Sequence, residues 1–138
     1  MYRYIVAIYL RLSVDDKRVE SMSNESQRLL LRKYAEILGD NVEIIEYVDN
    51  GYSGTNFERP AVQQLLTDVK TYKVNCILVK DFSRFGRNSI EVGYFTQQIF
   101  PLFGVRFISV SDNYDSDEHK GDTGGIAVAV KYLVNEYY

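Results

Sequence analysis

The stretch YLRLS, residues 9–13, ends the first apolar run of the sequence, which covers residues 4–12. A nearly continuous apolar run is typical of a β-strand that is buried on both faces, as in a parallel sheet. Arg11 and Ser13 would then lie at the carboxyl end of this strand, where open α/β sheets place their ligand crevice. The stretch therefore offers a hydroxyl nucleophile beside a guanidinium, although most serines after strands are loop or helix-capping residues.

Apolar runs and helical patterns alternate along the rest of the chain. Strands are expected at residues 5–12, 42–48, 74–79 and 105–110. Helices are expected from Ser23 or Asn24 to Leu38, from Pro60, from Ile90 to about Phe103 with Pro101 kinking or ending it, and from Thr123. Loops are expected at residues 13–22, 49–56, 80–87 and 111–122. This order predicts an α/β fold with three layers, a mainly parallel sheet of about four to five strands with helices on both faces.

The pattern divides the chain into a core and a terminal helix. Residues 1–122 carry the alternating elements and are interpreted as one α/β core. Residues 123–138 place apolar side chains on one helical stripe between Ile126 and Tyr137, and the chain stops within this pattern. Because a helix with an exposed apolar stripe needs a partner, we expect the truncated start of a long amphipathic oligomerisation helix.

The composition limits the possible classes of protein. With 138 residues, of which 46% are hydrophobic and 25% charged, the chain can form one domain with a real core. A self-sufficient DNA-binding domain usually carries a basic surplus, whereas the net charge here is −3, so this chain either does not bind nucleic acid or leaves most of the binding to a part that is not present. The single cysteine, Cys76, fits a buried thiol in a reducing compartment. With no signal peptide and no membrane-length apolar run, we expect a soluble cytoplasmic protein without a membrane partner.

The arginines have an informative distribution. Arg11 ends the first strand, Arg59 closes the loop after the second, and Arg84 and Arg87 follow the third. In a parallel sheet these three loops open on the same edge, so four guanidiniums could converge beside Ser13. Guanidinium groups match phosphate oxygens and stabilise negative charge that develops on them. The pattern therefore indicates phosphoryl transfer, although a single arginine at a strand end is usually a solvated charge.

Other catalytic and regulatory motifs fit less well. Residues 51–54 form neither a dinucleotide fingerprint nor a P-loop, and no GxSxG elbow is present. His119 is the sole histidine, which argues against a Ser-His-Asp triad. The acidic residues from Asp112 to Glu118 could bind a divalent cation, but a solvated loop is favoured. Because Asp49 ends a strand, a receiver-like regulatory module stays open as an alternative, as does a catalytically silent assembly domain.

Several separated blocks of residues resemble one family. They are Tyr9, Arg11 and Ser13, then Gln27, then Asp49 with YSGT at 52–55 and Arg59-Pro60, and then SRFGR at 83–87. In this order they resemble the catalytic domain of the serine recombinases, the resolvase and invertase superfamily, over essentially the whole chain. The segment YSGTNFERP and the acidic residues 113–116 are more similar to the large serine recombinases of conjugative transposons and phages than to small resolvases.

The resemblance implies a reaction and its partners. Ser13 would attack a DNA phosphodiester, leaving a 5′-phosphoserine link and a free 3′-hydroxyl. Dimers would pair into a synaptic homotetramer that exchanges and rejoins strands at recombination sites, as in transposon or phage excision and integration. The chemical step would need no metal or other cofactor, and zinc is possible only in DNA-binding domains missing from this chain. Residues 1–122 would be the catalytic core, acting at the bacterial nucleoid within the cytoplasm.

The resemblance also implies roles for individual residues. The phosphate-binding and activating arginines would be Arg11, Arg84 and Arg87, with Arg59 as a further active-site arginine. The supporting residues would be Tyr9, Gln27, Asp49, Ser53 and Ser83. Ser83 departs from the aspartate that small resolvases usually carry before the first arginine of this block, which leaves the general acid and base unassigned. We also expect Ser13 to be poorly aligned with the arginines when no DNA is bound.

Overall fold

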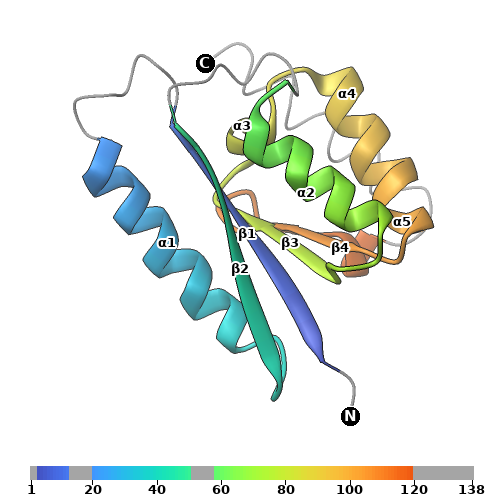
Figure 1. Ribbon diagram of the computed structural model, residues 1–138, viewed down its shortest axis with the longest axis horizontal. Coiled ribbons are helices and arrows are strands. Elements are labelled where there is room, and N and C mark those ends of the chain that lie inside the picture. Colours follow the sequence, from blue (N-terminus) through green and yellow to red (C-terminus); the bar gives the residue numbers. More distant parts are fainter. Residues whose placement is uncertain (1–2, 13–19, 51–57, 120–138) are drawn as a thin grey trace.

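A five-stranded sheet forms the centre of the protein, in the strand order β2-β1-β3-β4-β5 (Figure 1). The structure is a computed structural model, and it describes residues 3–12, 20–50 and 58–119. The strands are β1 (Tyr4–Leu12), β2 (Val42–Asn50), β3 (Cys76–Val79), β4 (Arg106–Ser109) and β5 (Tyr114–Asp115). The first four are parallel and β5 is antiparallel to β4. The predicted mainly parallel sheet is therefore confirmed.

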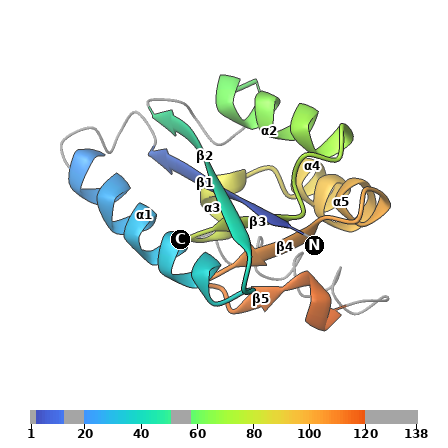
Figure 2. The same cartoon turned by 60° about the horizontal axis from the view of Figure 1, so that its bottom comes forward.

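Helices cover both faces of this sheet, as predicted (Figure 2). One face carries α1 (Glu20–Glu36) and the other carries α2 (Pro60–Lys70) and the continuous segment formed by α4 (Ser89–Tyr94), η2 (Phe95–Ile99) and α5 (Phe100–Leu102). None of the helices in the described part of the chain is both long and apolar enough to span a membrane.

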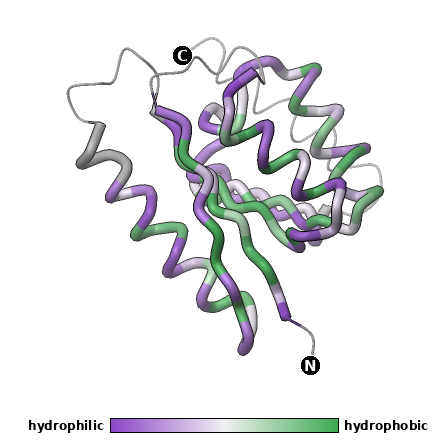
Figure 3. The backbone as a smooth tube through the Cα atoms, viewed as in Figure 1, coloured by the Kyte–Doolittle hydropathy of each residue, from purple (hydrophilic) through white to green (hydrophobic). Residues whose placement is uncertain are grey.

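The pleat of β1 assigns its side chains to the two faces. Val6, Ile8 and Leu10 are buried in the cluster that includes α1, whereas Ala7 and Tyr9 are buried in the cluster that includes α2. Apolar residues follow the middle of the strands, and β1 and β2 become hydrophilic toward their carboxyl ends (Figure 3). Because side chains alternate along a strand, Arg11 belongs to the same face as Tyr9.

The helix boundaries differ from the sequence expectations in several places. Helix α1 begins at Glu20, before the expected cap at Ser23 or Asn24, and ends at Glu36 rather than Leu38. Helix α2 begins at Pro60, as predicted, because proline suits the first helical position. The expected loop 13–22 is helical from residue 20 onward, and its earlier residues lie outside the described part of the chain. The expected helix from Thr123 also lies outside it.

Two short elements occur where only loops were expected. Helix α3 (Phe82–Phe85) lies within the predicted loop 80–87, and β5 followed by the 3₁₀ turn η3 (Ser116–His119) lies within the predicted acidic loop. Asp115 is accordingly buried and pairs with Arg106, so the expectation of a solvated loop was wrong for this residue.

The helix around Pro101 continues and changes its winding. Its hydrogen bonds widen to the π pattern in η2, where the N–H of Phe100 donates to the carbonyl of Phe95. The helix ends at Leu102, one residue after the proline, which agrees with the expected end. The chain then turns at Gly104, whose φ of +70° suits glycine.

Candidate active site

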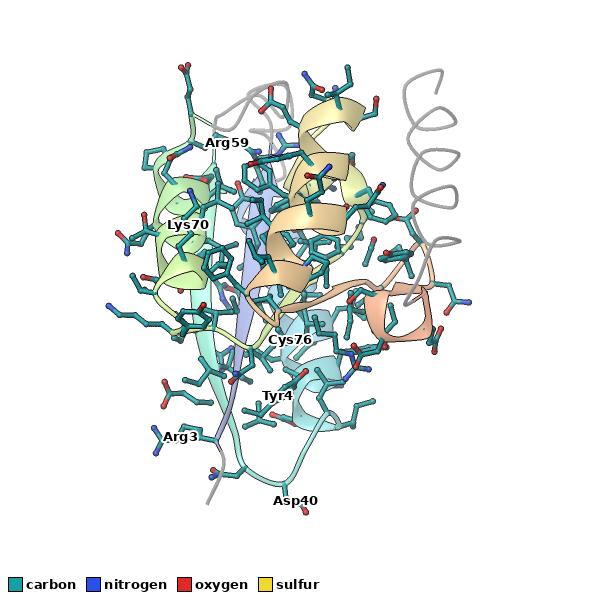
Figure 4. All side chains as sticks on the ribbon, turned by 90° about the vertical axis from the view of Figure 1, so that its right-hand side faces the viewer. Arg3, Tyr4, Asp40, Arg59, Lys70 and Cys76 are labelled. Atoms are coloured by element: carbon teal, nitrogen blue, oxygen red, sulfur yellow. The ribbon has the colours of Figure 1, made fainter. Side chains whose placement is uncertain are left out.

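The site begins with two buried arginines at the carboxyl edge of the sheet. Arg11, near the end of β1, and Arg59, directly before α2, are each 1% exposed. Arg59 lies at the end of the molecule opposite to Arg3 and Asp40, which mark the other edge (Figure 4). A buried charge is costly unless it is paired and hydrogen-bonded, so the partners of these guanidiniums define the site.

Both guanidiniums bind backbone carbonyls of α3. Arg11 donates from Nε to the Arg84 carbonyl at 2.9 Å and from Nη2 to the Ser83 carbonyl at 2.5 Å. Arg59 donates from Nη1 to the Arg84 carbonyl at 3.3 Å and from Nη2 to the Phe85 carbonyl at 2.5 Å. The last carbonyls of a helix lack N–H donors within the helix, so the two arginines cap the carboxyl end of α3.

A buried chain of hydrogen bonds links Arg59 to β1 and β2. Arg59 Nη1 donates to the hydroxyl of Tyr9 at 2.8 Å, and that hydroxyl donates to Asp49 Oδ2 at 2.9 Å. Burial raises the pKa of Tyr9 above its ordinary value; the Arg59 charge opposes this and Asp49 adds to it. Tyr9 therefore stays protonated and acts as a fixed bridge between the cation and the carboxylate.

Asp49 also caps α2. Its Oδ1 accepts from the N–H of Ala61 at 2.9 Å and its Oδ2 from the N–H of Val62 at 3.0 Å. The residue that precedes the helix, Arg59, makes no side-chain cap of its own. The carboxylate at the end of β2 thus satisfies two amides that have no partner within the helix.

The other two arginines have different surroundings. Arg84, on α3, is half-buried, and its Nε has no hydrogen-bond partner among the described residues. The distance from its Nη1 to Asp81 Oδ1 is 4.0 Å. Arg87, after α3, is exposed. These two guanidiniums are held less tightly by the protein than those of Arg11 and Arg59.

The four arginines influence one another electrostatically. Burial and the positive charges of Arg59, Arg87 and Arg84 together lower the pKa of Arg11 to about 10, although Tyr9 opposes this shift. Arg11 remains charged at neutral pH, and the cluster that we call the guanidinium cluster, Arg11, Arg59, Arg84 and Arg87, concentrates positive charge at one edge. Such an edge favours a bound anion, and phosphate in particular.

The remaining predicted site residues divide into two groups. Gln27 is buried on α1, and the hydroxyl of Ser83 donates to Asp81 Oδ1 at 2.6 Å. Ser13 and Ser53 lie outside the described residues, so their predicted roles stay predictions. The predicted poor alignment of Ser13 with the arginines therefore also stays a prediction.

Two carboxylates at the start of α3 were missed as site residues. Asp81 accepts from the N–H of Arg84 at 3.0 Å, and Asp112 accepts from the N–H of Phe82 at 2.8 Å. An aspartate directly before a short helix is a recognisable capping signal for Asp81. No local signal identifies Asp112, because its contact spans 30 residues of sequence. Among the described residues, no group of three or more His, Cys, Asp or Glu side chains could hold a metal ion.

The fold and the site together define an α/β domain with a cationic, anion-binding edge next to the end of its first strand. A family model described as "Resolvase, N terminal domain" matches residues 6–138. The chain belongs to this family, which confirms the resemblance seen in the sequence and does not favour the receiver-like alternative.

Solved structures agree with this assignment. The N-terminal catalytic domain of TP901-1 integrase is 30% identical, with a TM-score of 0.73 over 96% of this chain and 95% of that one. A resolvase family site-specific recombinase from Streptococcus pneumoniae is 31% identical, with a TM-score of 0.73 over 98% and 90%. A candidate DNA recombinase of Bacillus subtilis (strain 168) is 29% identical over 83 residues, 60% of this chain but only 16% of that protein. The chain therefore spans about a sixth of this curated relative.

Proposed function

We propose that this chain is the catalytic domain of a site-specific DNA recombinase, which cleaves and rejoins DNA through Ser13. The observation that carries the proposal is the guanidinium cluster at the carboxyl edge of the sheet, in a chain that belongs to the resolvase family. Strand β1 leads directly from the buried Arg11 into the residue before Ser13. A DNA phosphate placed at this edge would be next to the guanidinium groups that stabilise its charge.

The proposed reaction is a phosphoryl transfer without a cofactor. The Oγ of Ser13 forms a bond to phosphorus while the bond from phosphorus to the 3′ oxygen breaks. Ser13 loses its proton to a base, and the 3′ oxygen takes up a proton to become a free hydroxyl. The 5′-phosphoserine link conserves the phosphodiester energy, so that attack by a 3′-hydroxyl reverses the step and rejoins DNA. Guanidinium groups stabilise the charge on the phosphate oxygens, since they bind it more strongly as it develops.

The geometry supports different roles for the four arginines. Arg84 and Arg87 are the less restrained guanidiniums and would contact the phosphate directly. Arg11 and Arg59 bind the carbonyl groups of α3, the helix that carries Arg84. In addition to contributing positive charge, Arg11 and Arg59 would therefore position Arg84 and Arg87. Tyr9 and Asp49 would in turn position Arg59.

The proposed partners are recombination sites on DNA and further copies of the protein. The family assignment supports a homodimer and a synaptic homotetramer, in which residues 123–138 would begin the oligomerisation helix. Because the net charge is −3, we propose that separate DNA-binding domains, zinc-containing in the large members, supply most of the affinity for DNA. This proposal places the protein at the bacterial nucleoid in the cytoplasm.

Covalent trapping tests the proposal. The protein is incubated with fragments of the DNA that flanks its gene, each nicked so that cleavage releases a short strand and prevents rejoining. An SDS-stable protein–DNA adduct is expected, and mass spectrometry of the adduct peptide should place the nucleotide on Ser13. Ser13→Ala should abolish the adduct while DNA binding is retained. Ser111→Ala, which changes an exposed serine after β4, is the matched control and should form the adduct at the normal rate.

Two results would contradict the proposal. Persistence of the adduct in Ser13→Ala would exclude this serine as the nucleophile. Binding of the DNA by the unaltered protein with no adduct under any condition would favour the catalytically silent assembly domain instead.

A further inference from the structure

The first turn of α3 is held by two carboxylates from different parts of the chain. Asp81 Oδ1 accepts from the N–H of Arg84 at 3.0 Å and from the hydroxyl of Ser83 at 2.6 Å. Asp112 Oδ2 accepts from the N–H of Phe82 at 2.8 Å. These N–H groups belong to the first turn, which has no acceptors within the helix. Helix α3 therefore depends on external groups at both ends, with carboxylates at its start and guanidiniums at its end.

Asp112 is preorganised for this contact by the turn between β4 and β5. Asn113 adopts the left-handed conformation with φ of +53°, which asparagine tolerates better than most residues. The N–H of Ser111 donates to the carbonyl of Lys80 at 2.7 Å, which ties the turn to the end of β3. The buried hydroxyl of Ser109 donates to the same Oδ2 of Asp112 at 2.6 Å. The carboxylate oxygen is thus fixed by the sheet itself.

Aromatic packing attaches α3 to the sheet independently of Asp112. The ring of Phe82 is fully buried, with its centroid 6.0 Å from that of Phe107 and 5.4 Å from that of Tyr114. Phe85 contacts Phe107 at 5.2 Å between centroids. Removing the Asp112 carboxylate should therefore release one N–H group of α3 without detaching the helix.

We propose that Asp112 is a positioning residue for Arg84, acting through the Phe82 amide and α3. Helix α3 has only four residues, so a displacement of its first turn also displaces Arg84 and the carbonyls that Arg11 binds. The turn between β4 and β5 would in this way connect that hairpin to the guanidinium cluster. This inference rests on the proposed function of the cluster, and the following experiment separates the two.

The rate of adduct formation on the nicked DNA is compared for three variants. Asp112→Ala removes the carboxylate that accepts from the Phe82 amide. We expect the rate of adduct formation to fall by about tenfold to a hundredfold, which is the rate equivalent of losing one hydrogen bond to a charged group. The affinity for DNA should not change. Asp112→Asn places an amide oxygen where Oδ2 lies and should restore the rate to within about threefold. Asp117→Ala removes a more exposed carboxylate in η3, directly after the same hairpin, and should have no effect.

Hydrogen exchange provides a readout that does not depend on catalysis. In the peptide containing residues 80–88, the Phe82 amide should exchange faster in Asp112→Ala than in the unaltered protein, and Asp112→Asn should restore its protection. If the unaltered protein forms no adduct but the exchange results hold, the proposed function fails and the structural link survives. If Asp112→Ala forms the adduct at the normal rate, or if Asp112→Asn is as slow as Asp112→Ala, the positioning role is wrong.

Discussion

Replacement of Asp49 by alanine tests the buried network that supports the site. Asp49 is 2% exposed and accepts three hydrogen bonds, from the Tyr9 hydroxyl and from the amides of Ala61 and Val62. Alanine would leave both amides at the start of α2 without a side-chain cap. It would also remove the carboxylate that Tyr9 connects to the buried guanidinium of Arg59.

The expected loss can be worked out from these contacts. A hydrogen bond to a charged group contributes about 1.5–3 kcal/mol, and loss of a helix cap costs about 0.5–2 kcal/mol. The three contacts share one carboxylate, so their contributions do not add in full, and a total of about 3–5 kcal/mol lies between one such hydrogen bond and the sum of all three. We therefore expect Asp49→Ala to lower the free energy of unfolding by about 3–5 kcal/mol. That is a large part of the roughly 5–15 kcal/mol typical of a domain.

Urea unfolding of the 138-residue chain, followed by far-ultraviolet circular dichroism, measures this loss. Asp68→Ala is a matched control, because Asp68 also accepts from a tyrosine hydroxyl, that of Tyr47 at 2.7 Å, but is only partly buried and caps no helix. The control should cost about 1 kcal/mol. If Asp49→Ala costs no more than Asp68→Ala, the buried network does not stabilise the fold as inferred.

Three further predictions concern the same chain. For Glu46, burial raises the pKa, but hydrogen bonds from two arginines of α1 lower it below its ordinary value. The stabilisation by Glu46 is therefore present above its unfolded-state pKa and is lost as the pH falls through its folded-state pKa. Acidification should accordingly destabilise Glu46→Gln less than the unaltered chain. Burial raises the pKa of Cys76 to about 12, so a thiol reagent at about pH 8 should label it only after unfolding, and rapid labelling of the folded chain would contradict its burial. Gly104→Ala should cost about 1 kcal/mol in urea unfolding because φ is +70°; among the described residues other than its chain neighbours, none lies within 4 Å of the added Cβ, so the backbone conformation alone sets the cost. Gly39→Ala, without positive φ, should not show this loss.

The long elements could be predicted from the sequence because their patterns are local. The apolar run of β1 and the proline at the start of α2 each contain their own signal. Helix α3 and strand β5 carry no comparable signal, since they have four and two residues. The conformation of α3 depends on a distant partner, Arg11, and that of β5 depends on the pairing of Ser109 with Tyr114 rather than on a pattern of its own.

The candidate site shows the same distinction. The convergence of arginines could be inferred because parallel strands end at a common edge, and the structure does bring Arg11 and Arg59 to the same carbonyl of Arg84. The carbonyl contacts themselves could not be inferred, because any residue presents a carbonyl group. For the same reason the sequence did not distinguish tightly held guanidiniums from the exposed Arg87.

The central place of β1 has a consequence for synthesis of the protein. This strand leaves the ribosome before its partners, since it pairs with β2 on one side and β3 on the other, and the contact between Ile5 and Asn75 spans 70 residues. At elongation speeds of about 5–20 residues per second, that interval is on the order of ten seconds. During it, only β1, α1, β2 and α2 can associate, and one edge of β1 stays open to other nascent chains. Translation speed before β3 should therefore influence how much of the protein escapes aggregation.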